Sequence, residues 1–344
     1  MNAIVIRQHG GLEQLDYADV PRPEVKPGWV LVRTRAAALN HLDLWVLGGL
    51  PGLNLQMPHV PGSDGAGVVE EVGEGVRSFA PGDRVMLNAC VWCGSCEFCL
   101  QGEHSLCIRL KLIGEHLPGT FAECFQAPEA SLLKIPEGVD FEQAAAFSLV
   151  FLTAWRMLKT QARIQAAQDV FIHGIGSGVS TACLQIAKVS GARAFVSSSS
   201  DDKLQRARRM GADFAYNYRS SDVVDQVLRQ TGKRGTDIVV DSVGAETWLQ
   251  SLKIVCKGGR IVTCGATTGP APATNIPLIF WKQIRILGST MANAREYREV
   301  VRLLGQGRLS APIDRTFPLS EGKQALEYLH SGQQFGKIVL TIPA

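Results

Sequence analysis

Residues 169–188, DVFIHGIGSGVSTACLQIAK, constrain the fold of this chain more than any other stretch. Residues 170–173 suit a short buried strand, residues 174–178 are rich in glycine, and apolar or small residues then recur at helical spacing. A strand, a glycine turn and a helix form the first unit of a dinucleotide-binding fold. In that fold the glycines let the backbone approach a pyrophosphate, whose charge is held by free N–H groups and the positive end of the helix.

The spacing of the small residues departs from the pattern G-x-G-x-x-G. Val179 stands at the third glycine position, and a spacing one residue longer, with Gly174, Ser177 and Ser180, fits better. Because any tight strand-to-helix turn can look similar, the assignment depends on the segments further along the chain. Further strands are expected at 193–197, 214–218, 237–241, 260–264 and 284–288. Helical segments separate them, and this alternation predicts a parallel, doubly wound sheet.

The bulk properties narrow the class of protein. A chain of 344 residues is long enough for two domains. Its net charge of +3, without a long basic run, leads us to expect no nucleic-acid partner. No stretch reaches about 18 uninterrupted apolar residues, so we expect no membrane span. The N-terminal residues show no signal peptide, so we expect a cytoplasmic location, where nine cysteines favour metal ligands and buried thiols over disulfides.

Residues 90–107, CVWCGSCEFCLQGEHSLC, hold cysteines at short spacing. The expected metal ligands are Cys93, Cys96, Cys99 and Cys107. Four thiolates suit a closed tetrahedral zinc site with no open coordination position, so this zinc would be structural rather than catalytic. Free thiols or an iron–sulfur site are the alternatives, because ligand spacings overlap. Cys90 is a competing ligand, although we expect it to be an ordinary thiol.

The segments outside the dinucleotide unit are rich in short strands. Residues 1–90 and 108–150 are punctuated by glycine and proline, which suits a small, strongly curved barrel. We expect an alanine-rich helix at 140–148 and, near the C-terminus, helices at 296–304 and 324–330, followed by a strand at 337–341.

The second strand of a dinucleotide-binding sheet ends at the group that contacts the adenosine ribose, where an acidic residue favours NAD. Here that strand runs into four serines, residues 197–200, and Lys203 comes shortly after them. Hydroxyl donors and a cation favour a 2′-phosphate, so we expect NADPH rather than NADH. Asp201 and Asp202 count against this assignment, but both also suit the N-terminus of the next helix.

Together these features resemble the medium-chain dehydrogenase/reductase superfamily, with its zinc-containing alcohol dehydrogenase-like and quinone oxidoreductase-like branches. The motifs that carry the resemblance are GSDGAGVVEEVG at 62–73, C-G-x-C-x-x-C with Cys107, LTAW at 152–155, the glycine turn and FGKIVL at 335–340. The resemblance implies an α/β protein with a GroES-like β-barrel catalytic domain, residues 1–148 and 291–344, that carries the zinc lobe at 90–107. It also implies a Rossmann doubly wound parallel sheet at 149–290.

The sequence departs from the zinc alcohol dehydrogenases of that superfamily at the positions of their catalytic zinc. Those enzymes use a cysteine, a histidine beside a glutamate, and a later cysteine or aspartate. The corresponding residues here are Asn40, Ser63, Asp64 and Leu149. Asparagine, serine and leucine do not bind zinc as that site requires. The chain is thus similar to the zinc-independent quinone oxidoreductase branch, which shares the asparagine and an aspartate like Asp43 but mostly lacks the four-cysteine lobe.

This resemblance implies an NADPH-dependent oxidoreductase that reduces a quinone or an activated C=C bond by direct hydride transfer. The acceptor classes are enones, enals and enoyl thioesters, whose own carbonyl stabilises the charge without a metal. An alcohol, in contrast, needs a Lewis acid to lower its pKa. Some members of the branch place a tyrosine as proton donor near Trp45, which cannot donate in that way. Solvent or a nearby histidine would then supply the proton.

Two alternatives stay open. One is an alcohol dehydrogenase or carbonyl reductase with a rebuilt metal site that uses Asp64, His41 or His59, and the other is a non-catalytic NADPH-binding protein. The expected partners are a small hydrophobic acceptor and further copies of the chain. Residues 284–290 resemble the family's subunit-pairing edge, which implies a homodimer or homotetramer.

The resemblance also implies site residues, position by position. Asn40 would lie beside the nicotinamide and Thr153 would bound its pocket; with Asp43 they are the expected catalytic residues, although Asp43 also suits a structural role. The expected cofactor-binding residues are Asn40, Thr153, Gly174, Ser177, Gly178, Val179, Ser198, Lys203, Tyr218 and Gly265. The alternative for Tyr218 is a half-buried strand aromatic, and for Lys203 a solvated helix residue.

Overall fold

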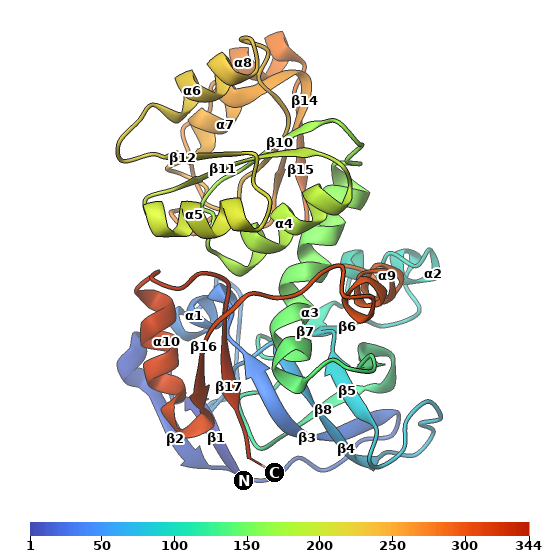
Figure 1. Cartoon of the computed structure of the whole chain (residues 1–344). Helices are drawn as coiled ribbons and strands as arrows, with labels where there is room; N and C mark the ends of the chain where they lie inside the picture. The colour runs from blue at the N-terminus through green and yellow to red at the C-terminus, as the bar shows by residue number, and fades with distance from the viewer. Residues whose placement is uncertain (344) are drawn as a thin grey trace. The chain divides into compact units, whose positions relative to one another are not determined.

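The computed structural model describes residues 1–343, and they form two compact units (Figure 1). The first unit comprises Met1–Leu149 together with the chain from Ala292 onward, and the second comprises Val150–Met291. Within residues 1–343, no helix is both long and apolar enough to cross a membrane.

Six parallel strands form the sheet of the second unit, in the order β12-β11-β10-β13-β14-β15. They are β10 (Asp169–Ile172), β11 (Arg193–Ser198), β12 (Phe214–Asn217), β13 (Thr236–Val240), β14 (Val255–Thr263) and β15 (Arg285–Gly288). The direction of strand order reverses between β10 and β13, and ligands of such sheets bind outside the carboxyl ends at this switch point. The doubly wound parallel sheet predicted from the sequence is confirmed.

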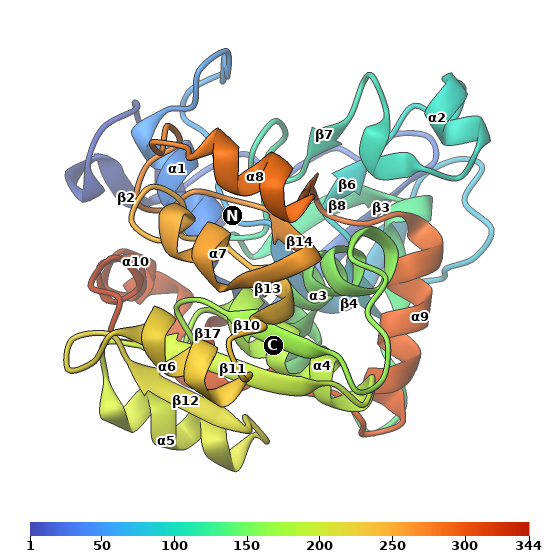
Figure 2. The same cartoon turned by 90° about the horizontal axis from the view of Figure 1, so that it is seen from above.

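Helices cover both faces of this sheet. They are α4 (Gly178–Val189), α5 (Asp201–Arg209), α6 (Val223–Gln230), α7 (Trp248–Ile254) and α8 (Ile276–Lys282). Figures 1 and 2 show α4 and α5 on one face, with α6, α7 and α8 on the other. Phe171, Phe195, Val239 and Ile261 of the strands pack with Leu252 of α7 in one buried cluster. This packing fixes the strands, and with them the loops at their carboxyl ends.

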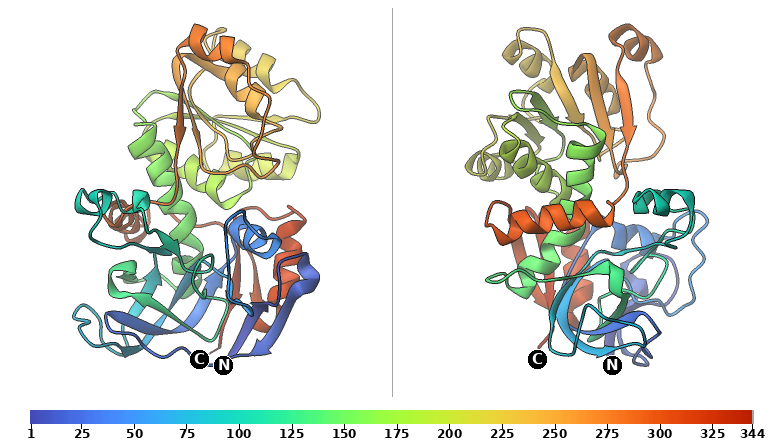
Figure 3. Two further views of the ribbon diagram at one scale, coloured as in Figure 1. Left: turned by 180° about the vertical axis from the view of Figure 1, so that it is seen from behind. Right: turned by 90° about the vertical axis from the view of Figure 1, so that its right-hand side faces the viewer.

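The first unit is built on a curved sheet in the order β16-β17-β3-β4-β5-β9, with β8 paired to β3. Its strands are β3 (Trp29–Ala38), β4 (Asp64–Val72), β5 (Arg84–Leu87), β8 (Cys124–Pro128), β9 (Leu132–Lys134), β16 (Ile313–Pro318) and β17 (Lys337–Thr341). β17 pairs antiparallel with β3, with Val339 opposite Ala38. The last strand thus completes a sheet that begins near residue 29, and Figure 3 shows β17 running toward the end of this unit at which the N-terminus lies. The GroES-like barrel expected from the resemblance is confirmed.

Smaller elements complete the first unit. Two antiparallel pairs join β1 (Asn2–Ile6) to β2 (Leu15–Asp19) and β6 (Cys90–Val91) to β7 (Lys111–Leu112). The helices are α1 (His41–Gly48), α2 (Glu97–Leu100), α9 (Ala294–Gly305) and α10 (Gly322–His330). Short 3₁₀ segments are η1 (Leu12–Gln14), η2 (His104–Leu106), η3 (Glu129–Ser131) and η5 (Leu319–Glu321).

Helix α3 (Phe141–Trp155) runs further than the helix expected near residues 140–148. No glycine or proline interrupts residues 149–155, so nothing in the sequence ends the helix there. A π-helical segment, η4 (Arg156–Gln161), comes directly after it. The LTAW motif therefore lies on a helix.

Candidate functional site

The cysteines of the lobe converge on one point. The cluster consists of Cys93, Cys96, Cys99 and Cys107. Their Sγ atoms all lie within 4.8 Å of one another, and those of Cys93 and Cys99 are 3.9 Å apart. A tetrahedral zinc ion with Zn–S bonds of about 2.3 Å holds its sulfurs about 3.8 Å apart, so the spacing fits this ion. Among residues 1–343, this is the one group of three or more potential ligands that comes together in this way.

Hydrogen bonds around the cluster lower the pKa of Cys93 and of Cys96 and so favour the thiolate, the form in which cysteine binds a metal, whereas burial raises the pKa of Cys99 to about 12. The N–H groups of Cys93 and Arg109 each donate to Cys107 Sγ at 3.4 Å. Hydrogen bonds from the backbone at Ser95 and from the Arg109 side chain lower the pKa of Cys93 to about 5. The donor set and its surroundings fit a structural zinc ion.

Contacts at its base anchor the lobe to the first unit. His104 Nδ1 accepts a hydrogen bond from the N–H of Ala294, at the start of α9, at 3.2 Å. Trp92 stacks on His104 with ring centroids 4.4 Å apart. Cys90 lies in β6, outside the cluster, with its Sγ 4.0 Å from the carbonyl oxygen of Ala292. The lobe is therefore held by contacts that do not involve the four ligands.

A buried lysine meets Asn40 and Asp64 elsewhere in the first unit. Lys337 Nζ donates to Asp64 Oδ2 at 2.9 Å, to Asn40 Oδ1 at 2.6 Å and to the carbonyl oxygen of Leu39 at 2.7 Å. The Asn40 amide also donates to Asp64 Oδ2 at 2.9 Å, and Asp64 Oδ1 accepts from the N–H of Leu149 at 2.8 Å. The Lys337 and Asp64 side chains are 2% and 0% exposed. The two opposite charges therefore neutralise each other where water does not reach them.

Sequence reasoning missed Lys337. Its signal was a lone lysine in the otherwise apolar stretch FGKIVL, because a charged residue on a buried strand needs a partner. Asp64 thus contacts both Asn40 and Leu149, two of the other positions that the resemblance aligns with a catalytic zinc site. His59, considered as a ligand of a rebuilt metal site, has its Nε2 3.1 Å from the carbonyl oxygen of Gly114.

Asp43 lies beside this network at the start of α1. Its Oδ2 accepts a hydrogen bond from the N–H of Asn40 at 2.7 Å, as part of a capping box. Asp43 Oδ1 and Ser63 Oγ are both buried and lack a hydrogen-bond partner within residues 1–343. Burial raises the pKa of Asp43 to about 7, although the bond from Asn40 and the charge of Lys337 oppose it. This carboxyl group therefore changes its charge near neutral pH.

In the second unit, β10 leads through the glycine turn into α4. Gly174 and Gly176 have φ angles of +60° and +124°, a region that side chains with a Cβ rarely adopt. Ser177 caps the helix, since its Oγ accepts from the N–H of Ser180 at 3.1 Å. The side chain of Lys203 lies over the turn, because a Cβ built on Gly176 would be 2.9 Å from Lys203 Cδ. A helix N-terminus with a lysine beside it suits a phosphate.

The residues predicted to contact a ribose phosphate lie at the ends of β11 and β12. Ser198 ends β11, and its Oγ accepts from the N–H of Ser200 at 3.3 Å. Tyr218 comes directly after β12, donates its N–H to the carbonyl oxygen of Ser198 at 3.1 Å, and has an exposed side chain. The carboxylate of Asp201 accepts a hydrogen bond from Asn217 Nδ2 at 2.8 Å. Of the two acidic residues near this position, Asp201 and Asp202, the first is therefore hydrogen-bonded to the last residue of β12.

The remaining predicted residues of the second unit lie in α3, at the start of α4 and after β14. Gly178 and Val179 open α4, and Gly265 lies just beyond β14. Thr153 is buried in α3, and its Oγ1 lacks a hydrogen-bond partner in the described part of the chain. The catalytic candidates Asn40 and Asp43 belong to the first unit.

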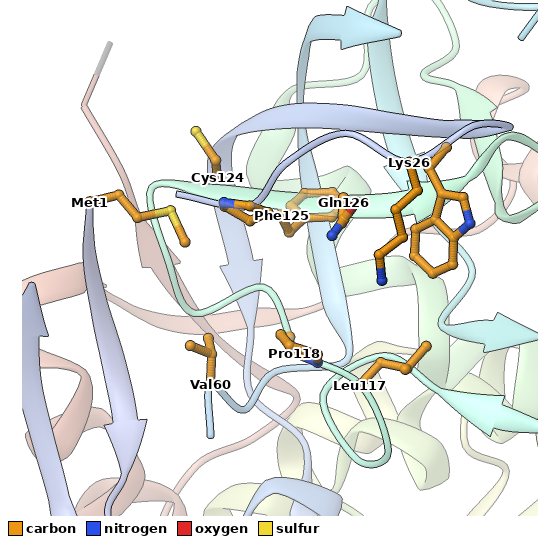
Figure 4. A pocket seen from close by; sticks show the side chains of 11 residues that line it. Met1, Lys26, Val60, Leu117, Pro118, Cys124, Phe125 and Gln126 are labelled. Atoms are coloured by element: carbon orange, nitrogen blue, oxygen red, sulfur yellow. The ribbon is translucent and has the colours of Figure 1, made fainter. Parts of the chain in front are cut away.

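A pocket of about 70 Å³ opens in another part of the first unit (Figure 4). Met1, Lys26, Cys124, Phe125 and Gln126 are among the residues that line it. Burial raises the pKa of the Cys124 thiol to about 11, which keeps it protonated. None of the predicted site residues lines this pocket.

Two family descriptions match the chain. "Zinc-binding dehydrogenase" matches residues 178–306, and "Alcohol dehydrogenase GroES-like domain" matches residues 26–137. A "Zinc-type alcohol dehydrogenase-like protein" of Schizosaccharomyces pombe is 33% identical over 98% of this chain and 98% of its own. An "Acryloyl-coenzyme A reductase" of Metallosphaera sedula is 30% identical over 99% of this chain and 100% of its own.

A solved structure described as an NAD-dependent alcohol dehydrogenase superposes with a TM-score of 0.96 at 44% identity, covering 100% of both chains. The matched domains and the relatives define an oxidoreductase. The chain belongs to the medium-chain dehydrogenase/reductase superfamily. Family and cysteine cluster together indicate zinc and a nicotinamide cofactor.

Proposed function

We propose that this protein is an NADPH-dependent reductase of activated C=C bonds or quinones that transfers hydride directly, without a catalytic zinc. The observation that carries the proposal is the network of Lys337, Asn40 and Asp64. Each of the three ammonium protons of Lys337 has an acceptor, and the Asp64 carboxylate is paired with that ammonium. An amide and an ion-paired carboxylate are poor ligands for zinc compared with thiolate and imidazole.

An acceptor with its own electron sink suits such a site. A quinone, enone or enoyl thioester takes hydride at carbon, and the charge moves onto its carbonyl oxygen. NADPH supplies the hydride when bound, and a proton then completes the reduction. A hydrogen-bond donor that meets the developing oxyanion speeds such a step. Asn40 and Asp43 are the residues proposed to contact or position the reacting groups, with Thr153 at the nicotinamide pocket.

The second unit supports the choice of cofactor. The glycine turn and the N-terminus of α4 suit the pyrophosphate, through Gly174, Ser177, Gly178 and Val179. Lys203, Ser198 and Tyr218 supply a cation and hydroxyl groups for a 2′-phosphate, and Gly265 leaves room beside β14. A relative with a similar fold is described as NAD-dependent, so the preference for NADPH requires a direct comparison of the two cofactors.

Two further parts of the proposal concern zinc and assembly. We assign one structural zinc to Cys93, Cys96, Cys99 and Cys107.

We also propose a homodimer or homotetramer paired through β15, an edge strand of the sheet. Ile276, Phe280 and Trp281 on α8 and Ile286 on β15 are 64%, 63%, 75% and 40% exposed. Exposed apolar side chains on an edge strand and on the helix that precedes it favour subunit contact.

Cofactor oxidation tests the proposal. NADPH and NADH are each mixed with panels of enones, quinones and aldehydes, and NADP⁺ and NAD⁺ with alcohols, before and after chelation of weakly held metal. The expected result is reduction of enones or quinones with NADPH that survives chelation, with one zinc per chain. Alcohol oxidation that chelation abolishes, with two metals per chain, would instead establish an alcohol dehydrogenase. Tight NADPH binding without turnover on any acceptor would establish a binding protein.

A further inference from the structure

Asp241 organises the loop at the carboxyl end of β13. Its carboxylate is 1% exposed and accepts four hydrogen bonds. Oδ1 accepts from the N–H groups of Val243 and Gly244, both at 3.0 Å, and from Thr247 Oγ1 at 2.8 Å. Oδ2 accepts from Ser251 Oγ at 2.6 Å, in helix α7. A buried carboxylate is stable only when it is paired or fully hydrogen-bonded, so this loop is built around the carboxylate.

The hydrogen-bond chain continues to the strand beside β13. His173 lies between β10 and the glycine turn, and its Nε2 lies 2.9 Å from Ser251 Oγ. Ser251 has one hydroxyl proton and donates it to Asp241, so His173 must donate its Nε2 proton to Ser251. Burial lowers the pKa of His173 to about 4, which keeps the ring neutral. The chain therefore fixes one tautomer of His173 and ties β10, β13 and α7 together.

The loop after β13 also contacts the loops on either side. A Cβ built on Gly174, in the glycine turn, would lie 3.3 Å from Val243 Cγ2. On the other side, the N–H of Thr268 donates to the carbonyl oxygen of Val243 at 2.8 Å. Gly244 approaches so closely that a Cβ there would lie 2.8 Å from the carbonyl oxygen of Gly269. The three loops after β10, β13 and β14 thus form one packed assembly at the switch point.

We infer that Asp241, acting through Ser251 and His173, is the positioning residue that holds these three loops in the conformation that binds the dinucleotide. The inference rests on the proposed function in one respect: it takes a nicotinamide dinucleotide as the ligand that binds at the carboxyl ends of these strands. None of the three side chains needs to contact the cofactor. Their role is to fix the glycine turn and the two neighbouring loops before the cofactor arrives, which lowers the ordering cost of binding.

Two variants and a matched control test the inference. Ser251→Ala breaks the connection to His173 and leaves the loop bonds to Oδ1 intact. Asp241→Asn keeps the shape but places an amide donor opposite Ser251, which reverses the chain and moves the His173 proton to Nδ1. The control is Thr236→Val, a buried hydroxyl at the opposite end of the same strand. Measurements are cofactor affinity, kcat at saturating cofactor, thermal stability, and the His173 tautomer by nitrogen NMR.

We expect Asp241→Asn to weaken NADPH binding about tenfold and Ser251→Ala about threefold, because a lost buried hydrogen bond changes an equilibrium by this order. The value of kcat at saturating cofactor should change less than about twofold in both. Thr236→Val should leave affinity unchanged. Unchanged affinity in the folded fraction of both variants, with only a lower melting temperature, would overturn the inference and leave Asp241 a purely structural residue.

Amide hydrogen exchange tests the positioning role of Asp241 independently of the proposed function. In Asp241→Asn, amides at 174–179, 242–247 and 265–269 should exchange faster than in the parent, while those of β12 should not. A parent protein that binds neither NADPH nor NADH would refute the proposed function. The exchange pattern would still decide whether Asp241 positions the three loops, and an unchanged pattern would refute that.

Discussion

Lys337 and Asp64 form an ion pair at 2.9 Å with both side chains buried, although 273 positions separate them in the chain. One lies at the start of the last strand and the other at the start of β4. Removing one partner of a buried pair leaves an uncompensated charge, whereas removing both often costs little. The pair therefore makes a sharp prediction about stability.

Lys337→Met should lower the free energy of unfolding by about 3 kcal/mol, because Asp64 would then be buried as an unpaired anion. Lys337→Met combined with Asp64→Asn should recover most of that loss. Urea unfolding of the two single variants and the double variant measures the coupling. If Lys337→Met alone changes the unfolding free energy by less than about 1 kcal/mol, an unpaired Asp64 does not carry the expected cost.

The pKa of Asp43 predicts a pH dependence of folding. An unfolded aspartate loses its proton near pH 4, while the native residue keeps it to about pH 7. Between these values the native state binds more protons, so stability falls as pH rises. Asp43→Asn keeps the acceptor for the Asn40 N–H and removes this dependence. The stability of the parent relative to the variant should drop by about 3 kcal/mol from pH 5 to pH 8.

Parallel denaturation series of parent and Asp43→Asn protein provide the measurement. Other titrating groups, including His173, act in both proteins and cancel in the difference. A difference that stays constant across this pH range would show that Asp43 ionises normally in the folded protein.

The cysteine cluster predicts one zinc per chain. Cys96→Ser should reduce the zinc content to near zero and lower the melting temperature by several degrees, since a structural metal contributes directly to folding. Cys90→Ala is the matched control, because Cys90 lies in the adjoining β6 but outside the cluster. Elemental analysis measures the zinc content, and calorimetry measures the melting temperature. Zinc loss in the Cys90 variant as well would mean that the ligand set is wrong.

Lys203 should discriminate between the two cofactors. Lys203→Ala is expected to raise KM for NADPH about tenfold and KM for NADH less than about twofold, because only NADPH carries the 2′-phosphate. Lys257→Ala, at an exposed lysine in β14, serves as the control for a general loss of positive charge. Equal effects of Lys203→Ala on both cofactors would place the lysine at the pyrophosphate instead.

Local patterns predicted much of this fold. The glycine turn of residues 174–178 and the alternation of strands and helices identified the doubly wound sheet, because both are read from neighbouring residues. The spacing of four cysteines likewise predicted their convergence. The end of α3 was misjudged, since a helix without glycine or proline has no local stop signal before Trp155.

The buried polar networks could not be predicted in the same way. The partners Lys337 and Asp64, or His173 and Ser251, are far apart in sequence, and their pairing depends on which strands become neighbours. The lone Lys337 in FGKIVL predicts a buried partner, but the sequence does not identify which residue it is. Asp241 looked like an ordinary residue at a strand end, and its four hydrogen bonds emerge only from the folded loop.

The pairing of β17 with β3 has a consequence for synthesis of the protein. The ribosome produces β3 early, yet its partner strand emerges only after the entire second unit has been made. A nascent chain can therefore form the parallel sheet of 150–291 while the barrel still exposes an open edge. The sheet of the first unit can be completed only once residue 341 has left the exit tunnel.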